Sequence, residues 1–277
     1  MPGTLYLVPT PIGNLGDISL RMKQTLECCD FIAAEDTRVT LKLLNHLSLK
    51  KPMAAYYRHN KEAGGQAILA RLLGGESCAL VTDAGTPAIS DPGEELVALC
   101  AAHDIPVISI PGPCALTVAL SASGLPTGRF TFEGFLAMNK KNRRIHLDSL
   151  QSEERTMIFY EAPHKLPATL ADLLVAFGPD RRISICRELT KLHEEILRTT
   201  LGEAAAHFSD HTPRGEFVLI LEGGSAPHEE APSEEEALEA VAQLLGEGLS
   251  PKDAIRKTAE QYGLSKNKLY DIYIKNN

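Results

Sequence analysis

Ionisable side chains follow two predicted β-strands in the first half of the chain. Asp36 and Arg38 come after the apolar run Phe31–Ala34, and His59 follows the run Met53–Tyr57. The carboxyl ends of parallel strands meet at one edge of a sheet, which is where open α/β sheets bind ligands. Carboxylates and imidazoles are the groups that most often take protons in catalysis. Two structural alternatives stay open: a helix N-cap at Asp36 or the residue after it, and a solvated histidine.

A second candidate binding segment is Val81–Gly93, which reads VTDAGTPAISDPG and continues from the apolar run Cys78–Val81, a predicted short buried strand. Gly85 permits a positive φ and Pro87 fixes its own φ, so the segment contains tight turns. Ser90 or Asp91 is expected to cap the helix that follows. Two tight turns exceed what a connector needs, which favours a ligand-binding loop over an ordinary strand-to-helix connection.

Basic residues are concentrated in two segments of a chain whose net charge is −8. The segment Asn139–Arg144 has four cations and no acid before Asp148. It is either the solvated start of a helix or a loop that faces phosphate groups, and the acidity of the whole chain favours the phosphate-facing loop. From Ser250 onward the tail contains six Lys or Arg and three acids, a balance that suits a basic helix–turn–helix or an ordinary helical bundle.

The composition of the chain excludes several classes of protein. With 277 residues and 44% hydrophobic residues, two or three domains with real cores are expected. The six cysteines show no CxxC spacing and are expected to be reduced, mostly buried thiols of a cytoplasmic protein. The sequence has no cluster of Cys and His that would indicate a metal site. No signal peptide precedes the first predicted strand, and no apolar run reaches the roughly 18 residues that a membrane-spanning helix needs.

Strands and helices alternate through the first half, so we predict a mostly parallel, doubly wound sheet there. The second half is predicted to be a more antiparallel α/β domain. The expected helices of these halves are 19–28, 66–73, 94–103, 115–123 and 165–177. A linker over 223–236 and three helices over 233–245, 251–262 and 266–274 follow. The expected domains are therefore 1–113, 114–224 and 225–277.

The segments in order resemble a known family. They include VPTPIGNLGDIS, AEDTR, YYRHN, VTDAGTPAISDPG, IPGPCA, FEGFL, FYEAPHK and RELTKLHEE. Together they are similar to the tetrapyrrole methylase superfamily, and within it to the ribosomal small-subunit RNA methyltransferase I group. The resemblance implies two α/β domains with S-adenosylmethionine in the cleft between them, plus a small C-terminal helical domain. It also implies a homodimer that methylates the ribose 2′-hydroxyl of a cytidine near the decoding centre of 16S rRNA.

The resemblance also nominates site residues. Positions that correspond to the family's cofactor contacts are Ile12, Asp83, Ala84, Gly85, Thr86, Ile89, Cys114, Ala115, Glu161 and Leu189. Asp36 corresponds to the aspartate proposed as the base of some tetrapyrrole C-methylases, which makes it the first candidate proton acceptor, with His59 second. The acid proposed in those enzymes is a lysine, and this chain has Arg58-His59-Asn60 in that region instead. The expected RNA contacts are Arg38, Lys140, Lys141, Arg143, Arg144, Lys266 and Lys268.

Two other functions stay open at this point. A precorrin or porphyrin C-methyltransferase would share the fold and cofactor, but it has no use for the two basic segments. A nonenzymatic DNA-binding protein could use the tail as a helix–turn–helix, but it leaves the α/β halves without a function. The expected partner is therefore 16S rRNA or the small ribosomal subunit, with no membrane and no metal.

Overall fold

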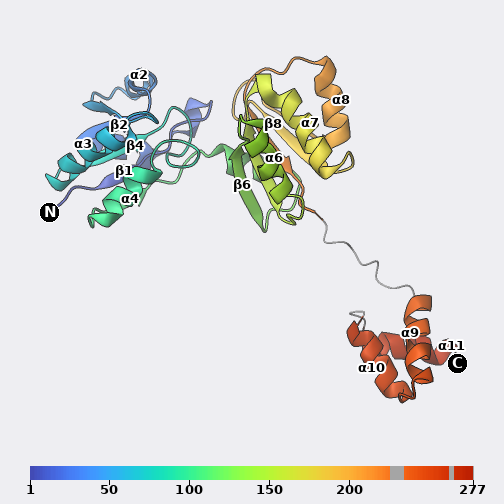
Figure 1. Ribbon diagram of the computed structural model, residues 1–277. Helices are drawn as coiled ribbons and strands as arrows, with labels where there is room; N and C mark the ends of the chain where they lie inside the picture. Colours follow the sequence, from blue (N-terminus) through green and yellow to red (C-terminus); the bar gives the residue numbers. More distant parts are fainter. Residues whose placement is uncertain (225–233, 262–264, 277) are drawn as a thin grey trace. The chain divides into compact units, whose positions relative to one another are not determined.

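The computed structural model describes residues 1–224, 234–261 and 265–276. Residues 1–223 form one compact unit that contains two five-stranded sheets (Figure 1). The first sheet is entirely parallel, with strand order β3-β2-β4-β1-β5. Its strands are β1 (Leu5–Leu7), β2 (Phe31–Ala34), β3 (Met53–Ala55), β4 (Cys78–Val81) and β5 (Val107–Ser109). The predicted doubly wound parallel sheet is confirmed.

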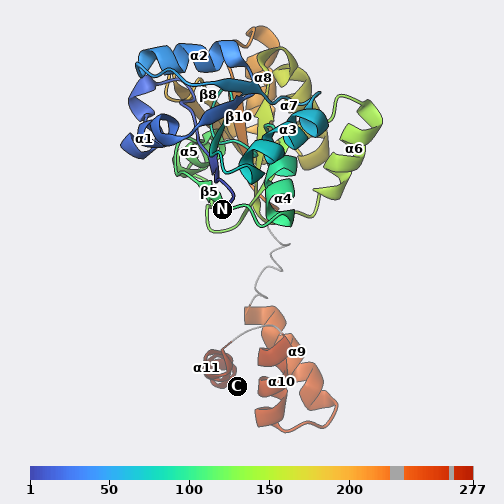
Figure 2. The same ribbon diagram turned by 90° about the vertical axis from the view of Figure 1, so that its left-hand side faces the viewer.

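Alternate residues of the first sheet pack against helices on opposite faces. On one face Phe31 and Leu80 join the core of α3 (Lys61–Leu73) and α4 (Glu94–Ala102), which lie side by side (Figure 2). On the other face Ile32 joins the core of α1 (Leu20–Cys28) and α2 (Thr37–His46). Both faces are buried, which is why the strands read as continuous apolar runs.

The second sheet has the order β6-β7-β10-β8-β9 and is antiparallel except for the β6–β7 pair, as predicted. Its strands are β6 (Phe130–Phe135), β7 (Thr156–Glu161), β8 (Arg182–Arg187), β9 (Glu195–Thr200) and β10 (Phe217–Leu221). One face packs on α6 (Lys140–Ser149), α7 (Leu166–Phe177) and α8 (Leu201–Asp210), and the other on α5 (Ala115–Ala122). The short 3-10 helices are η1 (Leu15–Asp17) and η2 (Pro163–Lys165).

Three local predictions differ from the structure. Helix α3 begins at Lys61, five residues before the predicted start, because Gly64 and Gly65 are accommodated inside its first turns. Helix α8 was not predicted; the sequence pattern that marks its start is a capping box between Thr200 and Glu203. The segment 139–144 is the start of α6 rather than a loop, with the Asn139 side chain accepting from two backbone N–H groups.

Helix geometry separates the cations of α6 from one another. Lys140, Lys141 and Arg144 are exposed, whereas the side chain of Arg143 is only 13% exposed. Its guanidinium donates to the carboxylate of Asp172 and, at 2.8 Å, to the hydroxyl of Thr169. Arg143 was predicted to contact RNA, but it is engaged inside the protein, because its place on the helix directs it at α7.

Replacing Arg143 with alanine should therefore destabilise the protein, whereas replacing Arg144 should not. The hydrogen bonds of Arg143 to a carboxylate and a buried hydroxyl predict a loss of about 1–3 kcal/mol in the free energy of unfolding. Among the residues that the structure describes, Arg144 forms only an exposed pair with Asp148, for which about 0–1 kcal/mol is expected. Urea denaturation of both variants measures the difference, and equal stabilities would contradict the internal role of Arg143.

Residues 224–277 form the second compact unit, with α9 (Glu234–Gly246), α10 (Pro251–Gln261) and α11 (Lys266–Asn276). Their shared core is Ala237, Val241, Ala254, Ile255, Ala259 and Leu269. Most of the predicted linker over 223–236, and the predicted helix start at Ser233, lie outside the described residues. The boundaries 1–113, 114–224 and 225–277 stay a proposal.

Within the described part of the chain, no helix has the length and apolar character required to cross a bilayer.

Candidate functional site

The turns after β1 and β4 meet at the carboxyl edge of the first sheet. β1 and β4 are neighbours, but the chain leaves them toward opposite ends of the sheet, which makes this a topological switch point. Thr10 and Gly85 form an antiparallel bridge between the two turns, with N–H···O distances of 2.9 and 3.0 Å. The Thr86 hydroxyl donates to the carbonyl of Pro113 at 2.8 Å. These bonds fix the loop beside the segment that leads into the second sheet.

The backbone of the loop after β4 is unusual. Gly85 has φ of +89°, and the non-glycine residues Ala88 and Ser90 have φ of +64° and +73°. Such non-glycine conformations are costly, and they concentrate at ligand-binding and catalytic loops. Contrary to the prediction, neither Ser90 nor Asp91 caps α4. The N-cap is Gly93, which has no side chain to form a capping hydrogen bond. The side chain of Asp91 is therefore not used in capping.

This loop forms one wall of a cavity of about 540 Å³, a size typical of small-molecule sites. Both α/β halves of the first unit line it, as the prediction of a cleft between two domains requires. Its lining residues are Ile12, Ala84, Gly85, Thr86, Ile89, Ser90, Asp91, Cys114, Ala115, Phe135, Tyr160, Glu161, Ala162, Pro163, His164, Glu216, Phe217 and Val218.

Most residues nominated as cofactor contacts meet in this cavity: Ile12, Ala84, Gly85, Thr86, Ile89, Cys114, Ala115 and Glu161. Asp83 and Leu189 are not among its lining residues. Asp83 accepts from the N–H of Asp36 at 3.1 Å, and Leu189 is buried in the core beside α5. The lining residues that sequence reasoning missed include Asp91 and the segment Glu216–Val218, which only the pairing of β10 with β7 brings to the cavity.

The charged groups that line the cavity are carboxylates. Glu161 accepts from the N–H of Ala162 at 2.8 Å and from the hydroxyl of Thr169. Glu216 forms an ion pair with Lys191 and is largely exposed. Asp91 is half-buried, and burial together with the charge of Glu35 raises its pKa to about 6. No Lys or Arg is among the lining residues, so the cavity suits a cationic ligand better than a phosphate.

Neither candidate proton acceptor from the sequence lines this cavity. Asp36 is the N-cap of α2 and forms an ion pair with Arg38, which holds the pKa of that carboxyl down at about 2. The side chain of Arg38 is exposed apart from that pair. His59 is exposed in the turn before α3. The catalytic role of Asp36 or His59 stays a prediction, but the structure shows that the helix-cap alternative for Asp36 is realised.

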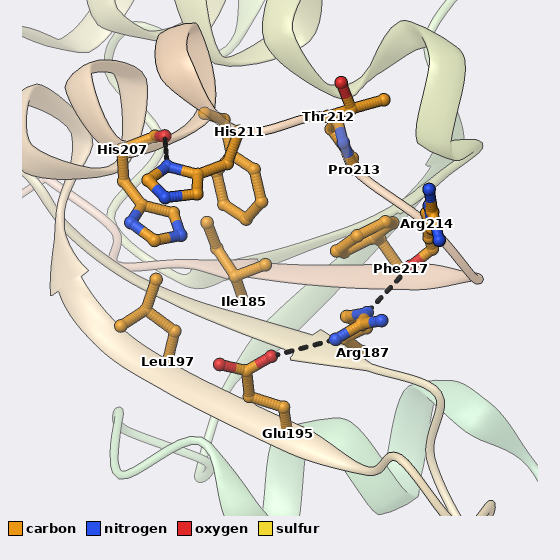
Figure 3. Close-up of a pocket in the computed structure, with 11 residues that line it drawn as sticks. Ile185, Arg187, Glu195, Leu197, His207, His211, Thr212, Pro213, Arg214 and Phe217 are labelled. Carbon is orange, nitrogen blue, oxygen red and sulfur yellow. Dashed lines mark hydrogen bonds and ion pairs between the residues drawn. The ribbon is translucent and has the colours of Figure 1, made fainter.

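A smaller pocket of about 210 Å³ lies beneath the end of α8 (Figure 3). Arg187 contacts Glu195 at 3.2 Å and donates to the carbonyl of Arg214 at 2.7 Å. The imidazoles of His207 and His211 stack with centroids 4.5 Å apart. Its volume is below the range typical of small-molecule sites, and its one carboxylate, Glu195, is already paired with Arg187, so we place the candidate site in the larger cavity.

Two protein families match parts of this chain. Residues 4–205 match the family described as Tetrapyrrole (Corrin/Porphyrin) Methylases. The chain belongs to the tetrapyrrole methylase family. Residues 231–276 match a second family, described as the RsmI C-terminal HTH domain, which agrees with the predicted helical tail. The family resemblance seen in the sequence is confirmed, and so is the predicted tetrapyrrole methylase α/β fold with a C-terminal helical domain.

Curated relatives cover almost the whole chain. A protein of Synechocystis sp. named ribosomal RNA small subunit methyltransferase I is 49% identical over 98% of this chain and 97% of its own length. A protein of Escherichia coli O157:H7 with the same name is 45% identical over 97% of this chain and 93% of its own. The similarity includes the helical tail as well as the α/β halves.

Solved structures share the fold at low identity. A uroporphyrin-III C-methyltransferase from Thermus thermophilus, complexed with S-adenosylhomocysteine, has a TM-score of 0.57 and 17% identity, covering 79% of this chain and 97% of that one. A diphthine synthase has a TM-score of 0.62 and 12% identity, with coverages of 79% and 90%. At these identities the likeness supports the tetrapyrrole methylase fold and nothing finer.

Proposed function

We propose that this protein transfers the methyl group of S-adenosylmethionine to the ribose 2′-hydroxyl of a cytidine in 16S rRNA near the decoding centre. The observation that carries the proposal is similarity of 43–49% identity over nearly the full length of relatives named ribosomal RNA small subunit methyltransferase I. The cavity between the two sheets supplies a place for the cofactor. The helical tail, which the relatives also share, supplies a second surface for RNA.

The cavity fits S-adenosylmethionine in size and charge. The carboxylates of Asp91 and Glu161, with no Lys or Arg among the lining residues, suit a sulfonium cation. Ala84-Gly85-Thr86 and Cys114-Ala115 would hold it, mainly through backbone groups and apolar contacts. When bound, the cofactor supplies an electrophilic methyl group for displacement by an oxygen nucleophile. The chain's own part is to exclude water, align the hydroxyl and take up its proton.

The start of α6 is connected to the cavity by a short chain of contacts. Arg143 donates to the hydroxyl of Thr169, and that hydroxyl donates to Glu161 in the cavity wall. Lys140 and Lys141 are therefore carried by a helix turn anchored to the site, where they could meet RNA phosphates. Phe135 also lines the cavity and is 55% exposed, so its ring offers a face for stacking a nucleobase.

Two further surfaces are proposed for the partner and for self-association. Lys266 and Lys268 are exposed on α11 and would add phosphate contacts from the helical tail. A homodimer is proposed from the family resemblance. Light scattering at micromolar concentration tests it, and a purely monomeric mass would reject it.

Mass spectrometry of 16S rRNA from cells with and without the protein tests the proposed reaction. The rRNA from cells that contain the protein should be heavier by about 14 Da at one cytidine ribose, which is the mass added when a methyl group replaces a hydrogen. Purified protein, S-adenosylmethionine and small subunits from the deficient cells should restore it. Methylation of uroporphyrinogen by the protein, with unchanged rRNA, would instead favour a tetrapyrrole C-methyltransferase. Binding to duplex DNA without any methylation would favour a DNA-binding protein.

A further inference from the structure

Asp91 has a position in the cavity that no other carboxylate shares. Of the three carboxylates in the lining, Glu161 is bonded to Thr169 and Glu216 is paired with Lys191. Within the described residues, Asp91 forms no ion pair, and its contact is with the hydroxyl of Thr82. It lies on the loop in which Ala88 and Ser90 have positive φ. The loop therefore presents Asp91 to the cavity with no cation to neutralise it.

The contact between Asp91 and Thr82 is unusual because Thr82 has a second acidic partner. The Thr82 hydroxyl is buried and donates to Glu35 at 2.7 Å. A threonine hydroxyl has one hydrogen, so it cannot donate to two carboxylates at once. If Asp91 takes up a proton, it can donate to the Thr82 oxygen while Thr82 keeps donating to Glu35. The arrangement therefore accommodates a protonated Asp91 better than an ionised one.

Burial and the acidic groups around Asp91 raise its pKa. Glu35 at the end of β2 and Asp83 at the end of β4 both raise its pKa by their negative charge, after burial, which is the largest cause. Tyr160 faces it from the second sheet and stays a neutral phenol, because burial raises the pKa of Tyr160. A hydrogen bond donated by Thr82 would lower the pKa of Asp91, but the Thr82 hydroxyl donates to Glu35 instead. The resulting pKa of about 6 suits a base that works near neutral pH.

We propose that the Asp91 carboxylate accepts the proton of the substrate hydroxyl, with Thr82 and Glu35 as positioning residues. This inference rests on the proposed methyl transfer. As the hydroxyl oxygen forms its bond to the methyl carbon, the carbon–sulfur bond breaks and its electron pair stays on sulfur. The hydroxyl proton moves to Asp91, and from there it is released to solvent after the product leaves. No other reactant is required.

The first test is single-turnover methylation of small ribosomal subunits by Asp91→Asn, with Asp104→Asn as a matched control. Asp104 is exposed at the far end of α4, away from the cavity. Loss of the base should slow Asp91→Asn by about 10²–10⁴-fold and leave the control unchanged. The wild-type rate should rise with pH to a plateau above pH 6, whereas the residual rate of Asp91→Asn should lack that rise.

Two readouts separate a proton acceptor from a structural or binding residue. S-adenosylhomocysteine has no sulfonium charge, so its affinity by calorimetry should be the same for Asp91→Asn and wild type. Because folding raises the pKa of Asp91, its ionisation disfavours the folded state as pH rises from about 4 through 6. Asp91→Asn without cofactor should therefore melt at a higher temperature than wild type at pH 8 and at the same temperature at pH 3.5.

The outcomes distinguish the two proposals. If wild type leaves rRNA unmethylated, the proposed function fails, although the melting curves still report on Asp91. If wild type is active and Asp91→Asn keeps the normal rate, the inference about Asp91 is overturned. It is also overturned if Asp36→Asn is inactive while Asp91→Asn is not, or if Asp91→Asn loses affinity for S-adenosylhomocysteine.

Discussion

Replacing Gly85 with leucine is expected to abolish S-adenosylmethionine binding, with a loss of more than about 100-fold in affinity, while the protein stays folded. Gly85 lines the cavity and has φ of +89°. A Cβ there would be 3.4 Å from the side chain of Ile12 and 3.9 Å from the carbonyl of Pro113, which is ordinary contact. The longer leucine side chain would occupy the volume that the cofactor requires.

Backbone strain has to be separated from loss of volume in this experiment. Gly178→Leu is the matched control, because Gly178 has φ of +83° and a Cβ added there would meet nothing within 4 Å. Both substitutions should cost about 1–3 kcal/mol of stability, because each places a side chain on a backbone conformation that favours glycine. Only Gly85→Leu should prevent binding in isothermal titration calorimetry. A folded Gly85→Leu protein that binds with wild-type affinity would show that the cofactor lies elsewhere.

The second large effect is expected in RNA binding. Replacing Lys140, Lys141 and Arg144 with alanine together should flatten the slope of log affinity against log salt by about two to three units. Each of the three cations is exposed on α6 and is proposed to neutralise one phosphate. Release of condensed counterions from those phosphates gives the salt dependence. The slope is measured with 16S rRNA at several salt concentrations.

Arg143 provides the control for this triple variant. Because its guanidinium is engaged by Asp172 and Thr169, Arg143→Ala should lower stability but leave the salt slope of RNA binding unchanged. Affinity for S-adenosylmethionine should be unaffected in the triple variant. A slope that stays at the wild-type value in the triple variant would mean that the three exposed cations are only a solvated helix face.

The sequence by itself determined the parallel sheet of the first half, and most of the residues that it nominated as cofactor contacts line one cavity. Apolar runs bounded by Gly, Pro and Asp predicted β2 and β4 with their observed bounds, because a strand buried on both faces needs a continuous apolar stretch. The segment around Gly85 was predicted to bind a ligand, because its glycine and prolines permit tight turns. These features are local, so neighbouring residues are enough to reveal them.

The tertiary structure alone decided which acidic and basic groups are available for chemistry. Asp36 and Asp91 both follow strands and both could cap a helix, and the sequence favoured Asp36 as the proton acceptor. In the fold, Asp36 caps α2 and pairs with Arg38, whereas positive φ at Ala88 and Ser90 places Asp91 in the cavity wall. Arg143 is engaged by Asp172, 29 residues further along the chain. The direction of a side chain and its distant partners depend on packing, which spacing in the sequence does not encode.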